Sequence, residues 1–408
     1  MRKVLLHILL LALLLVLPLC ATAKSRINNP NVKSLQVVVN GNWLAAPVMR
    51  LNSNDVLNIS FDELSHDYHR YVYQLEHCEA DWTTSEGVFE SDWLEGFNSN
   101  TIDDYEHSSN TVIAYTHYQL QIPNDRCSLK LSGNYRLHVL DEYDDNREVL
   151  VAEFMVTEQS MSLSMSATSN TDIDTHHSHQ QVSMSLNYGS LPVTNPDEQI
   201  YAVVMQNAQE RGIKRNVKAN LTTLNGLEWS HNRQLIFDAG NEYRKFEVLD
   251  ASHPTMGIDR IVWDGENYQA YPFVDEPRPN YLYDEDANGA FCIRNSDNRE
   301  VNTTSEYVWV NYRLRTISTQ PVYISGRWTY EQPETYRMTY HLDEDLYTAS
   351  ILQKQGYYSY QYLCGNGDLL PSEGSYYQTE NRYQAFIYYK GTNDRTWRLS
   401  VVGDTSLE

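Results

Sequence analysis

The chain has 408 residues, of which 31 are lysine or arginine and 54 are aspartate or glutamate, so its net charge is −23. A surface this acidic repels nucleic acid and anionic lipid headgroups, which argues against binding to either. The length suits two or three domains of about 100 to 200 residues each.

The N-terminus has the layout of a secretory signal. A basic start is followed by an apolar run from Val4 to Leu19 and by Ala-Thr-Ala at residues 21–23. We expect cleavage after residue 23 and an exported mature chain. A lipoprotein signal acylated at Cys20 is the alternative, but a leucine precedes this cysteine where a small residue is needed. No later apolar run approaches the ~18 residues of a membrane helix, so we expect no direct membrane span.

The rest of the chain has the pattern of an all-β protein. There are 31 tyrosines, short alternating runs recur between turn signals, and no long run has the 3.6-residue apolar period of a helix. Asn40-Gly41 and Ser132-Gly133-Asn134 lie between apolar runs and predict hairpins. The predicted fold is a set of tandem immunoglobulin/fibronectin-like β-sandwich domains.

Three groups of strands set the expected domain boundaries. After the signal peptide over 1–23, we expect sandwiches over 24–158, 159–315 and 316–408. The Ser/Met/Thr-rich stretch from Met161 and the segment Thr316–Gln320 are the expected connectors.

In the first group, the strand-like sequence HRYVYQLEHC at residues 69–78 raises the question of a reactive site, because histidine and cysteine stand side by side. Strand alternation places His77 and Cys78 on opposite faces. The face of His77 also carries Tyr71, Tyr73 and Leu75. A cysteine nucleophile needs its base within hydrogen-bond reach, and no second zinc-ligand pair stands nearby. We therefore expect a structural role.

The mature cysteines are Cys78, Cys127, Cys292 and Cys364. An oxidising compartment favours a disulfide between Cys78 and Cys127, whose side chains should both point inward. Two separate buried thiols are the alternative.

Several longer motifs carry a family resemblance. They are YQLEHCEADW, SSNTVIAYTHYQLQIPN and SGNYRLHV, then GNEYRKFEVLD, YDEDANGAFCI and EYVWVNYRL, and finally ILQKQGYYSYQYL and EGSYYQTENRYQAFIYYKG. In this order they resemble the plug protein of the type IX secretion system over nearly the whole mature chain. The closing TWRLSVVG departs from the family pattern at Thr396, Trp397 and Val402, which puts in doubt any specific role for that strand.

The resemblance implies a non-enzymatic function. Proteins of this family are understood to close the periplasmic mouth of a large outer-membrane β-barrel translocon, so the implied partner is that barrel and the implied location is the periplasm, peripherally associated with the translocon. No Gly-x-Ser-x-Gly, phosphate-loop or His-Glu-x-x-His motif occurs, and we assign no catalytic residue, metal or cofactor.

Two stretches are typical of metal sites, but other interpretations are favoured. DTHHSH contains Asp174, His176, His177 and His179, in the most loop-like part of the chain. DEDANG matches half of an EF-hand loop, but its twelfth position is Asn295 instead of glutamate. We expect a hairpin turn there, at Asn288-Gly289 between Tyr283 and Phe291.

The C-terminal group also suggests a function of another class. Its outline resembles the small sandwiches of starch-active enzymes, in which exposed aromatic rings stack on sugars. The candidate rings are Trp328, Tyr330, Tyr357 and Tyr358. Aromatic residues on strands usually pack in the core, so this function is the less favoured one. An exported carbohydrate-binding protein is therefore kept as the alternative function.

Two tyrosine-containing acidic segments are the expected partner contacts. One is the loop from Gly96 to Thr111, and the other is a polar turn at residues 377–381 between two strands. The candidate residues are Asp103, Asp104, Tyr105, Tyr377, Glu380 and Asn381. The second strand of that hairpin should carry Tyr383, Ala385, Ile387 and Tyr389 on one face. The alternative is that these tyrosines complete the last sandwich.

Overall fold

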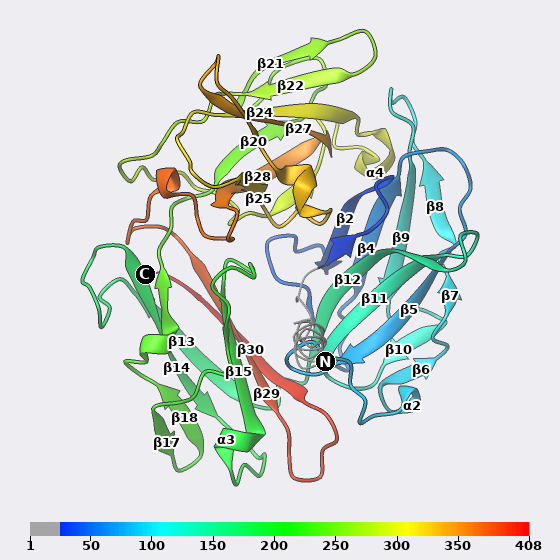
Figure 1. Cartoon of the computed structure of the whole chain (residues 1–408). Coiled ribbons are helices and arrows are strands. Elements are labelled where there is room, and N and C mark those ends of the chain that lie inside the picture. The colour runs from blue at the N-terminus through cyan, green and yellow to red at the C-terminus, as the bar shows by residue number, and fades with distance from the viewer. Residues whose placement is uncertain (1–24, 408) are drawn as a thin grey trace, which may run out of the picture.

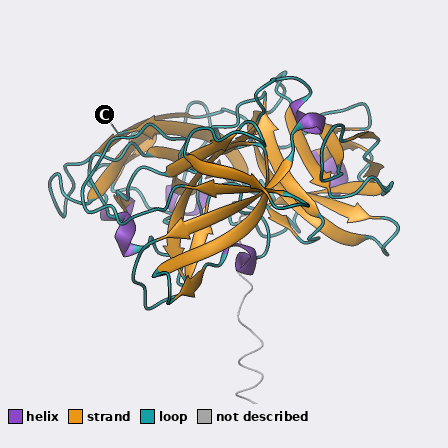
Figure 2. Ribbon diagram, turned by 90° about the horizontal axis from the view of Figure 1, so that it is seen from above, coloured by secondary structure: helices purple, strands orange, loops and turns teal. Residues whose placement is uncertain are grey.

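The structure is a computed structural model that describes residues 25–407. The expected signal peptide and Cys20 lie outside the described residues. The described chain is built of strands with only short helices, as Figure 2 shows. The strands form three pairs of facing sheets, so the expectation of an all-β fold of tandem sandwiches is confirmed.

Sandwich 1 comprises residues 25–158. Its first sheet runs β1 (Arg26–Ile27), β12 (Arg147–Thr157), β11 (Gly133–Asp141), β5 (Tyr71–Cys78) and β7 (Asn100–Thr101), with β3 (Val48–Arg50) parallel to β12. Its second sheet runs β2 (Val32–Val39), β4 (Leu57–Glu63), β9 (Thr116–Ile122) and β8 (Asp104–His107). A ribbon of β6 (Leu94–Gly96) and β10 (Cys127–Leu129) and the helix α2 (Glu90–Trp93) complete it.

Both predicted hairpins of sandwich 1 are wrong, although the chain does turn at Asn40-Gly41. Asn40 and Gly41 have positive φ angles, but β2 before them pairs with β4 and β3 after them pairs with β12. Likewise β10 pairs with β6, whereas β11 pairs with β5 and β12. Turn residues reverse the chain locally, but in a sandwich the next strand can join the opposite sheet.

Sandwich 2 is built from two separate parts of the chain, residues 159–243 and 375–407. One sheet runs β13 (Ser162–Thr168), β14 (His179–Asn187), β18 (Gly226–Trp229) and β17 (Leu221–Thr223), with β19 (Ile236–Asp238) beside β14. The other runs β16 (Lys214–Arg215), β15 (Ile200–Gln206), β29 (Arg382–Tyr389) and β30 (Arg398–Ser406). Helices α3 (Pro196–Gln199) and η1 (Arg233–Leu235) lie in its loops.

Sandwich 3, residues 244–374, is inserted into sandwich 2. One sheet contains β20 (Arg244–Val248), β28 (Gly356–Cys364) and β23 (Phe291–Ile293), with β25 (Val322–Ser325) also on β28. The other runs β21 (Ile258–Trp263), β22 (Tyr268–Pro272), β24 (Tyr307–Leu314), β27 (Leu346–Lys354) and β26 (Thr339–His341). Its short helices are α4 (Val301–Thr304), η2 (Pro333–Tyr336) and η3 (Pro371–Glu373).

The expected boundary at residue 315 is therefore wrong. β24 and β27, on either side of it, pair along their whole lengths, and β29 pairs with β15 of the preceding sandwich. Figure 1 shows the red C-terminal strands beside green β15, with the inserted sandwich above them and sandwich 1 to the right. A connector-like composition marks where a strand ends, but it does not reveal which distant strand pairs with it.

Candidate functional site

The histidine–cysteine pair of β5 is part of the scaffold. The alternation expected for this strand is confirmed, because Tyr71, Tyr73 and Leu75 are buried in the core of sandwich 1. His77 Nδ1 lies 2.8 Å from Ser85 Oγ, its Nε2 lies 3.1 Å from the Ser132 carbonyl oxygen, and burial lowers its pKa. Cys78 lies on the other face, where burial raises the pKa of its thiol. A buried thiol held in its neutral form is a poor nucleophile.

The turn after Cys78 joins sandwich 1 to sandwich 2. The carboxylate of Glu79 accepts hydrogen bonds from Thr396 Oγ1 at 2.9 Å and from the Trp397 backbone N–H at 3.0 Å. Two of the residues that depart from the family pattern thus contact the N-terminal sandwich. The sequence carried no signal for this contact, because more than 300 residues separate its partners.

The expected disulfide between Cys78 and Cys127 is wrong, because all four cysteines of residues 25–407 are free. Cys127 Sγ lies 3.4 Å from the hydroxyl of Tyr73, near the start of β5, whereas Cys78 ends that strand. The two thiols also lie on opposite faces of β5, since Tyr73 faces the core with Cys127. The two separate buried thiols are what the structure contains.

The first predicted partner-contact segment is accessible. Every residue of β8 is exposed, including Asp104 and Tyr105, and Asp103 just before it is exposed and ion-paired with Arg126. The Tyr105 ring lies 5.5 Å from the exposed ring of Tyr68. β8 is the outermost strand of its sheet, so this edge presents acids, aromatic rings and unpaired backbone groups.

The second predicted segment, residues 377–381, is a linker between sandwiches instead of a hairpin turn. Glu380 is exposed and Tyr377 half-buried, but Asn381 is only 2% exposed, so its assignment as a partner contact is wrong. Its side-chain amide donates to the Ala239 carbonyl oxygen at 2.6 Å and to Gln180 Oε1 at 3.0 Å. Figure 1 places this segment, just before β29, on the opposite side of the molecule from β8.

The strand after this linker is core, as the alternative interpretation had it. One face of β29 belongs to the core of sandwich 2. This face carries Tyr383, Ala385, Ile387 and Tyr389.

The two metal-like stretches make internal contacts. His179 Nδ1 lies 2.7 Å from Asp174 Oδ2, and Asp286 accepts a backbone hydrogen bond from Asn288. Asn288 and Gly289 form a turn with positive φ angles, but the predicted hairpin is wrong, because no strand directly precedes the turn and β23 after it pairs with β28. Over residues 25–407, no group of three or more His, Cys, Asp or Glu side chains is arranged to hold a metal ion.

The aromatic rings considered for sugar binding are mostly core. Trp328 is 8% exposed and donates from its indole nitrogen to the Ser359 carbonyl oxygen at 3.0 Å. Tyr357 and Tyr358 are also buried, and Tyr330 packs against the core of sandwich 1. These rings present no flat exposed face on which a sugar ring can stack.

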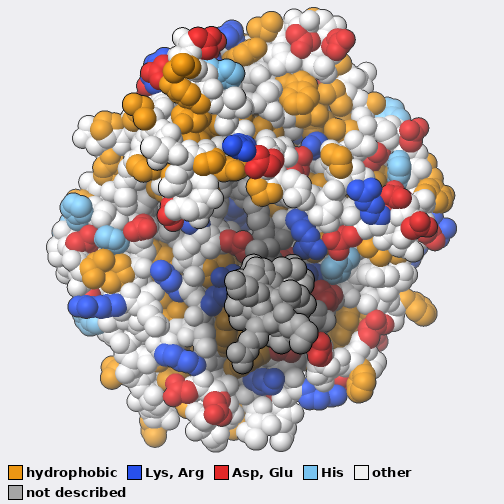
Figure 3. Space-filling model, viewed as in Figure 1, with side chains coloured by type: hydrophobic (Ala, Val, Ile, Leu, Met, Phe, Trp, Pro, Cys, Tyr) orange, Lys and Arg blue, Asp and Glu red, His pale blue; other side chains and the backbone are white. Residues whose placement is uncertain are grey.

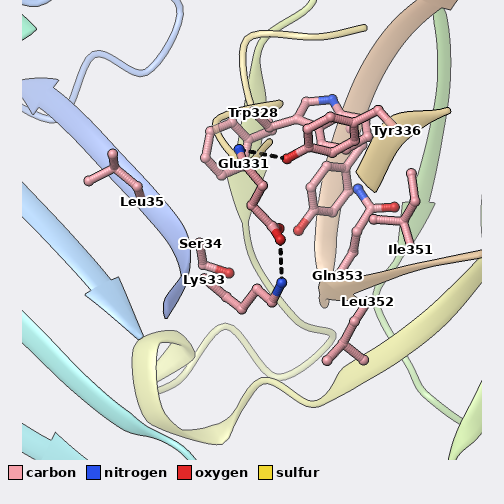
Figure 4. Close-up of a pocket in the computed structure, with 11 residues that line it drawn as sticks. Lys33, Ser34, Leu35, Trp328, Glu331, Tyr336, Ile351, Leu352 and Gln353 are labelled. Carbon is pink, nitrogen blue, oxygen red and sulfur yellow. Dashed lines mark hydrogen bonds and ion pairs between the residues drawn. The ribbon is translucent and has the colours of Figure 1, made fainter. Parts of the chain in front are cut away.

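A pocket lies between sandwich 1 and sandwich 3 (Figure 4). Lys33, from β2, and Glu331, from sandwich 3, form an ion pair across it. Figure 4 shows this pair between Trp328 and Tyr336 on one side and Ser34 on the other. The remaining lining residues are Leu35, Phe291, Ile351, Leu352, Gln353 and Tyr358.

Beside this pocket, a buried charge cluster connects the same two sandwiches. Asp62 of β4 and Lys354 of β27 are each 1% exposed, with Oδ2 and Nζ 2.6 Å apart. Tyr307 donates to the same oxygen at 2.7 Å, and His117 Nδ1 lies 2.7 Å from Oδ1. Burial alone would raise the pKa of Asp62, but Lys354 and His117 outweigh it and hold that pKa below its ordinary value.

The surface in Figure 3 mixes charged side chains of both signs with hydrophobic ones, and it is hollowed between the upper sandwich and the two below it. Among residues 25–407, no helix is long and apolar enough to cross a membrane.

A family model and a solved structure are similar to this chain. A family model described as the type 9 secretion system plug protein 1st domain matches residues 32–158, which is nearly the whole of sandwich 1. A crystal structure of a hypothetical protein from Parabacteroides merdae ATCC 43184 is 33% identical, covers 95% of this chain and 100% of its own, and superposes with a TM-score of 0.90. No curated protein matches the chain.

Two further solved structures are far less similar. A DNA-bound alkylpurine DNA glycosylase AlkC from Pseudomonas fluorescens is 11% identical with a TM-score of 0.16, covering 31% of this chain and 30% of its own. The collagen adhesin of S. aureus is 9% identical with a TM-score of 0.12, covering 95% of each chain. Scores this low carry no argument about fold or function.

Proposed function

Because the chain belongs to the type IX secretion system plug protein family, we propose that it closes the periplasmic opening of that system's outer-membrane β-barrel translocon. Family membership ties the chain to type IX secretion; the plugging role, the barrel partner and the peripheral position in the periplasm are the proposal. The observation that carries it is the match of the plug-family model to sandwich 1.

The proposed role is non-enzymatic. Side chains that would serve as catalytic groups have structural partners instead: His77 contacts Ser85 and a backbone carbonyl, and Asp62 is neutralised by Lys354. The Asp62–Lys354 pair lies between sandwiches 1 and 3, and the ion pairs of Glu373 with Arg244 and Arg278 lie inside sandwich 3.

The β8 edge is the proposed docking surface on sandwich 1. Its exposed acids suit a neutral or basic rim, and Tyr68 and Tyr105 offer flat contact area with hydroxyls that can keep a polar partner. A contact that must later open should be of this mixed kind, since interfaces as apolar as a domain core are usually permanent.

The test is co-purification of the barrel from outer membranes. A tagged wild-type chain should recover a large barrel protein, identified by mass spectrometry. The variant Asp103→Lys/Asp104→Lys should recover much less, and the deficit should shrink as salt is raised, because screening weakens exposed charge contacts. A matched control, Asp343→Lys/Glu344→Lys, reverses two exposed acids of sandwich 3 and should behave as wild type.

Failure of the wild-type chain to recover any barrel would contradict the plug proposal. Normal recovery by Asp103→Lys/Asp104→Lys at low salt would contradict only the docking surface. Glu380→Lys is tested separately, because the segment before β29 lies on the opposite side of the molecule from β8 (Figure 1), and it decides whether the linker surface takes part.

A further inference from the structure

Sandwiches 1 and 2 meet through an apolar interface. Buried Ala46, Ala80 and Met155 of sandwich 1 form one cluster with residues of sandwich 2. The sandwich 2 members that are buried in this cluster are Val203, Phe386, Tyr388 and Leu399. Interfaces with this composition resemble a domain core and are typical of permanent contacts.

Sandwiches 1 and 3 also have apolar contacts, of Tyr330 with the sandwich 1 core and of Trp43 with Tyr357, but buried charge and hydrogen bonds join them as well. Besides the ion pair of Asp62 and Lys354, the carboxylate of Glu306 accepts from the backbone N–H groups of Val112 and Ile113, at 2.5 and 3.2 Å. Charged and hydrogen-bonding groups recover their hydration when the surfaces separate, so separating this polar part costs less than exposing an apolar surface of the same size.

The interface between sandwiches 1 and 3 contains buried polar atoms without hydrogen bonds and a pocket that its side chains do not fill. His117 Nε2 and Gln353 Nε2 are buried atoms without a hydrogen-bond partner within the described chain. Gln353 also lines the pocket between the two sandwiches. Each buried group that lacks a hydrogen bond disfavours the closed arrangement relative to an open one in which water hydrates the group.

A pivot is present on the other side of sandwich 3. The chain enters and leaves this sandwich through two linkers, residues 239–243 and 374–381, which run side by side: Thr379 Oγ1 donates to the Gly240 carbonyl oxygen at 2.9 Å. Gly240 and Gly374 both have positive φ angles, which glycine adopts without strain. Two linkers that lie side by side allow sandwich 3 to rotate about one axis relative to sandwich 2.

We propose that sandwich 3 is a hinged unit that separates from sandwich 1 at the Asp62–Lys354 cluster and pivots on the paired linkers, while sandwiches 1 and 2 remain one rigid body. This inference concerns the isolated chain and does not depend on the plug function.

Native-state hydrogen exchange of the purified mature chain tests it. Four backbone N–H groups of sandwich 1 donate to sandwich 3, those of Ile27, Ser109, Val112 and Ile113. The backbone N–H groups of Glu158 and Trp397 bridge sandwiches 1 and 2. In wild type the first set should exchange at least about 10-fold faster than the second, with a smaller dependence on urea, since opening one interface exposes less surface than global unfolding.

Variants sharpen the test. Lys354→Met leaves Asp62 buried without its cation and should speed exchange of the first set by roughly 100-fold or more, with the second set unchanged. The control Arg136→Met breaks the buried pair of Arg136 and Glu153 inside sandwich 1 and should produce no such selective increase.

Equal protection of both sets in wild type, lost only on global unfolding, would overturn the hinge. So would an equal acceleration of both sets in Lys354→Met. The wild-type comparison stands alone if the variant does not fold.

Discussion

Replacing Glu373 with alanine should destabilise sandwich 3 by about 3–5 kcal/mol, because it leaves buried charges without their counter-ion. The Glu373 side chain is 0% exposed and lies between two guanidinium groups: Arg244 Nε donates to its two oxygens at 3.1 and 3.2 Å, and Arg278 forms the second ion pair. The Tyr362 backbone N–H also donates to it, at 3.0 Å. Glu373→Gln keeps an acceptor for that N–H and should cost less, about 1–3 kcal/mol.

The same site predicts a pH dependence. Burial alone would raise the pKa of Glu373, but Arg244 and Arg278 outweigh it and hold the pKa below its ordinary value of 4.5. A carboxyl with a lowered pKa contributes stability above that ordinary value and loses it as the pH falls through the folded-state pKa. The wild type should therefore lose stability below about pH 4.5 more steeply than Glu373→Gln.

The assay is equilibrium urea unfolding followed by tryptophan fluorescence and circular dichroism. Glu334→Ala removes an exposed ion pair with Arg337 in the same sandwich and should change the free energy of unfolding by under about 1 kcal/mol. A loss of under about 1 kcal/mol for Glu373→Ala as well would refute the reasoning, since it would mean that water or another acceptor replaces the carboxylate.

Three further outcomes are expected. Burial disfavours the charged form of His138, but hydrogen bonds to two glutamates outweigh this effect and raise its pKa to about 9. The stability of the wild type should therefore fall as the pH rises from 6.5 through 9. Melting curves of His138→Gln should lack this fall, and a pH dependence equal to that of the wild type would contradict the assignment. Alkylation of unreduced, denatured protein should label both Cys78 and Cys127. A measured mass that lacks both labels would instead support the disulfide. Trp328→Ala should lower the free energy of unfolding by about 3–5 kcal/mol. Gels containing soluble glucans should not retard the wild-type protein. If they do, and Trp328→Ala abolishes the retardation, the carbohydrate-binding alternative is supported.

The candidate site was only partly predictable. Exposed acids at Asp103 and Asp104 follow from a polar loop sequence, and their exposure needs no long-range information. Asn381 has an equally polar context, yet it is buried, because the linkers on either side of the inserted sandwich cover each other there. A local sequence does not show which other segment lies on top of it.

The sequence by itself determined those properties of the protein that have a local cause. Alternation in β5 and in β29 predicted which side chains share a face, because the strand period of two depends only on backbone geometry. The all-β class followed from the same pattern, and the family from long motifs in order.

The tertiary structure alone decided the rest. It pairs β15 with β29, so sandwich 2 is split; it buries the second face of β29, with Phe386 and Tyr388, against sandwich 1; and it brings Asp62 to Lys354. Each of these depends on long-range strand register and on which surfaces meet. That choice is set by the combined burial of the whole chain, which no single stretch of residues specifies.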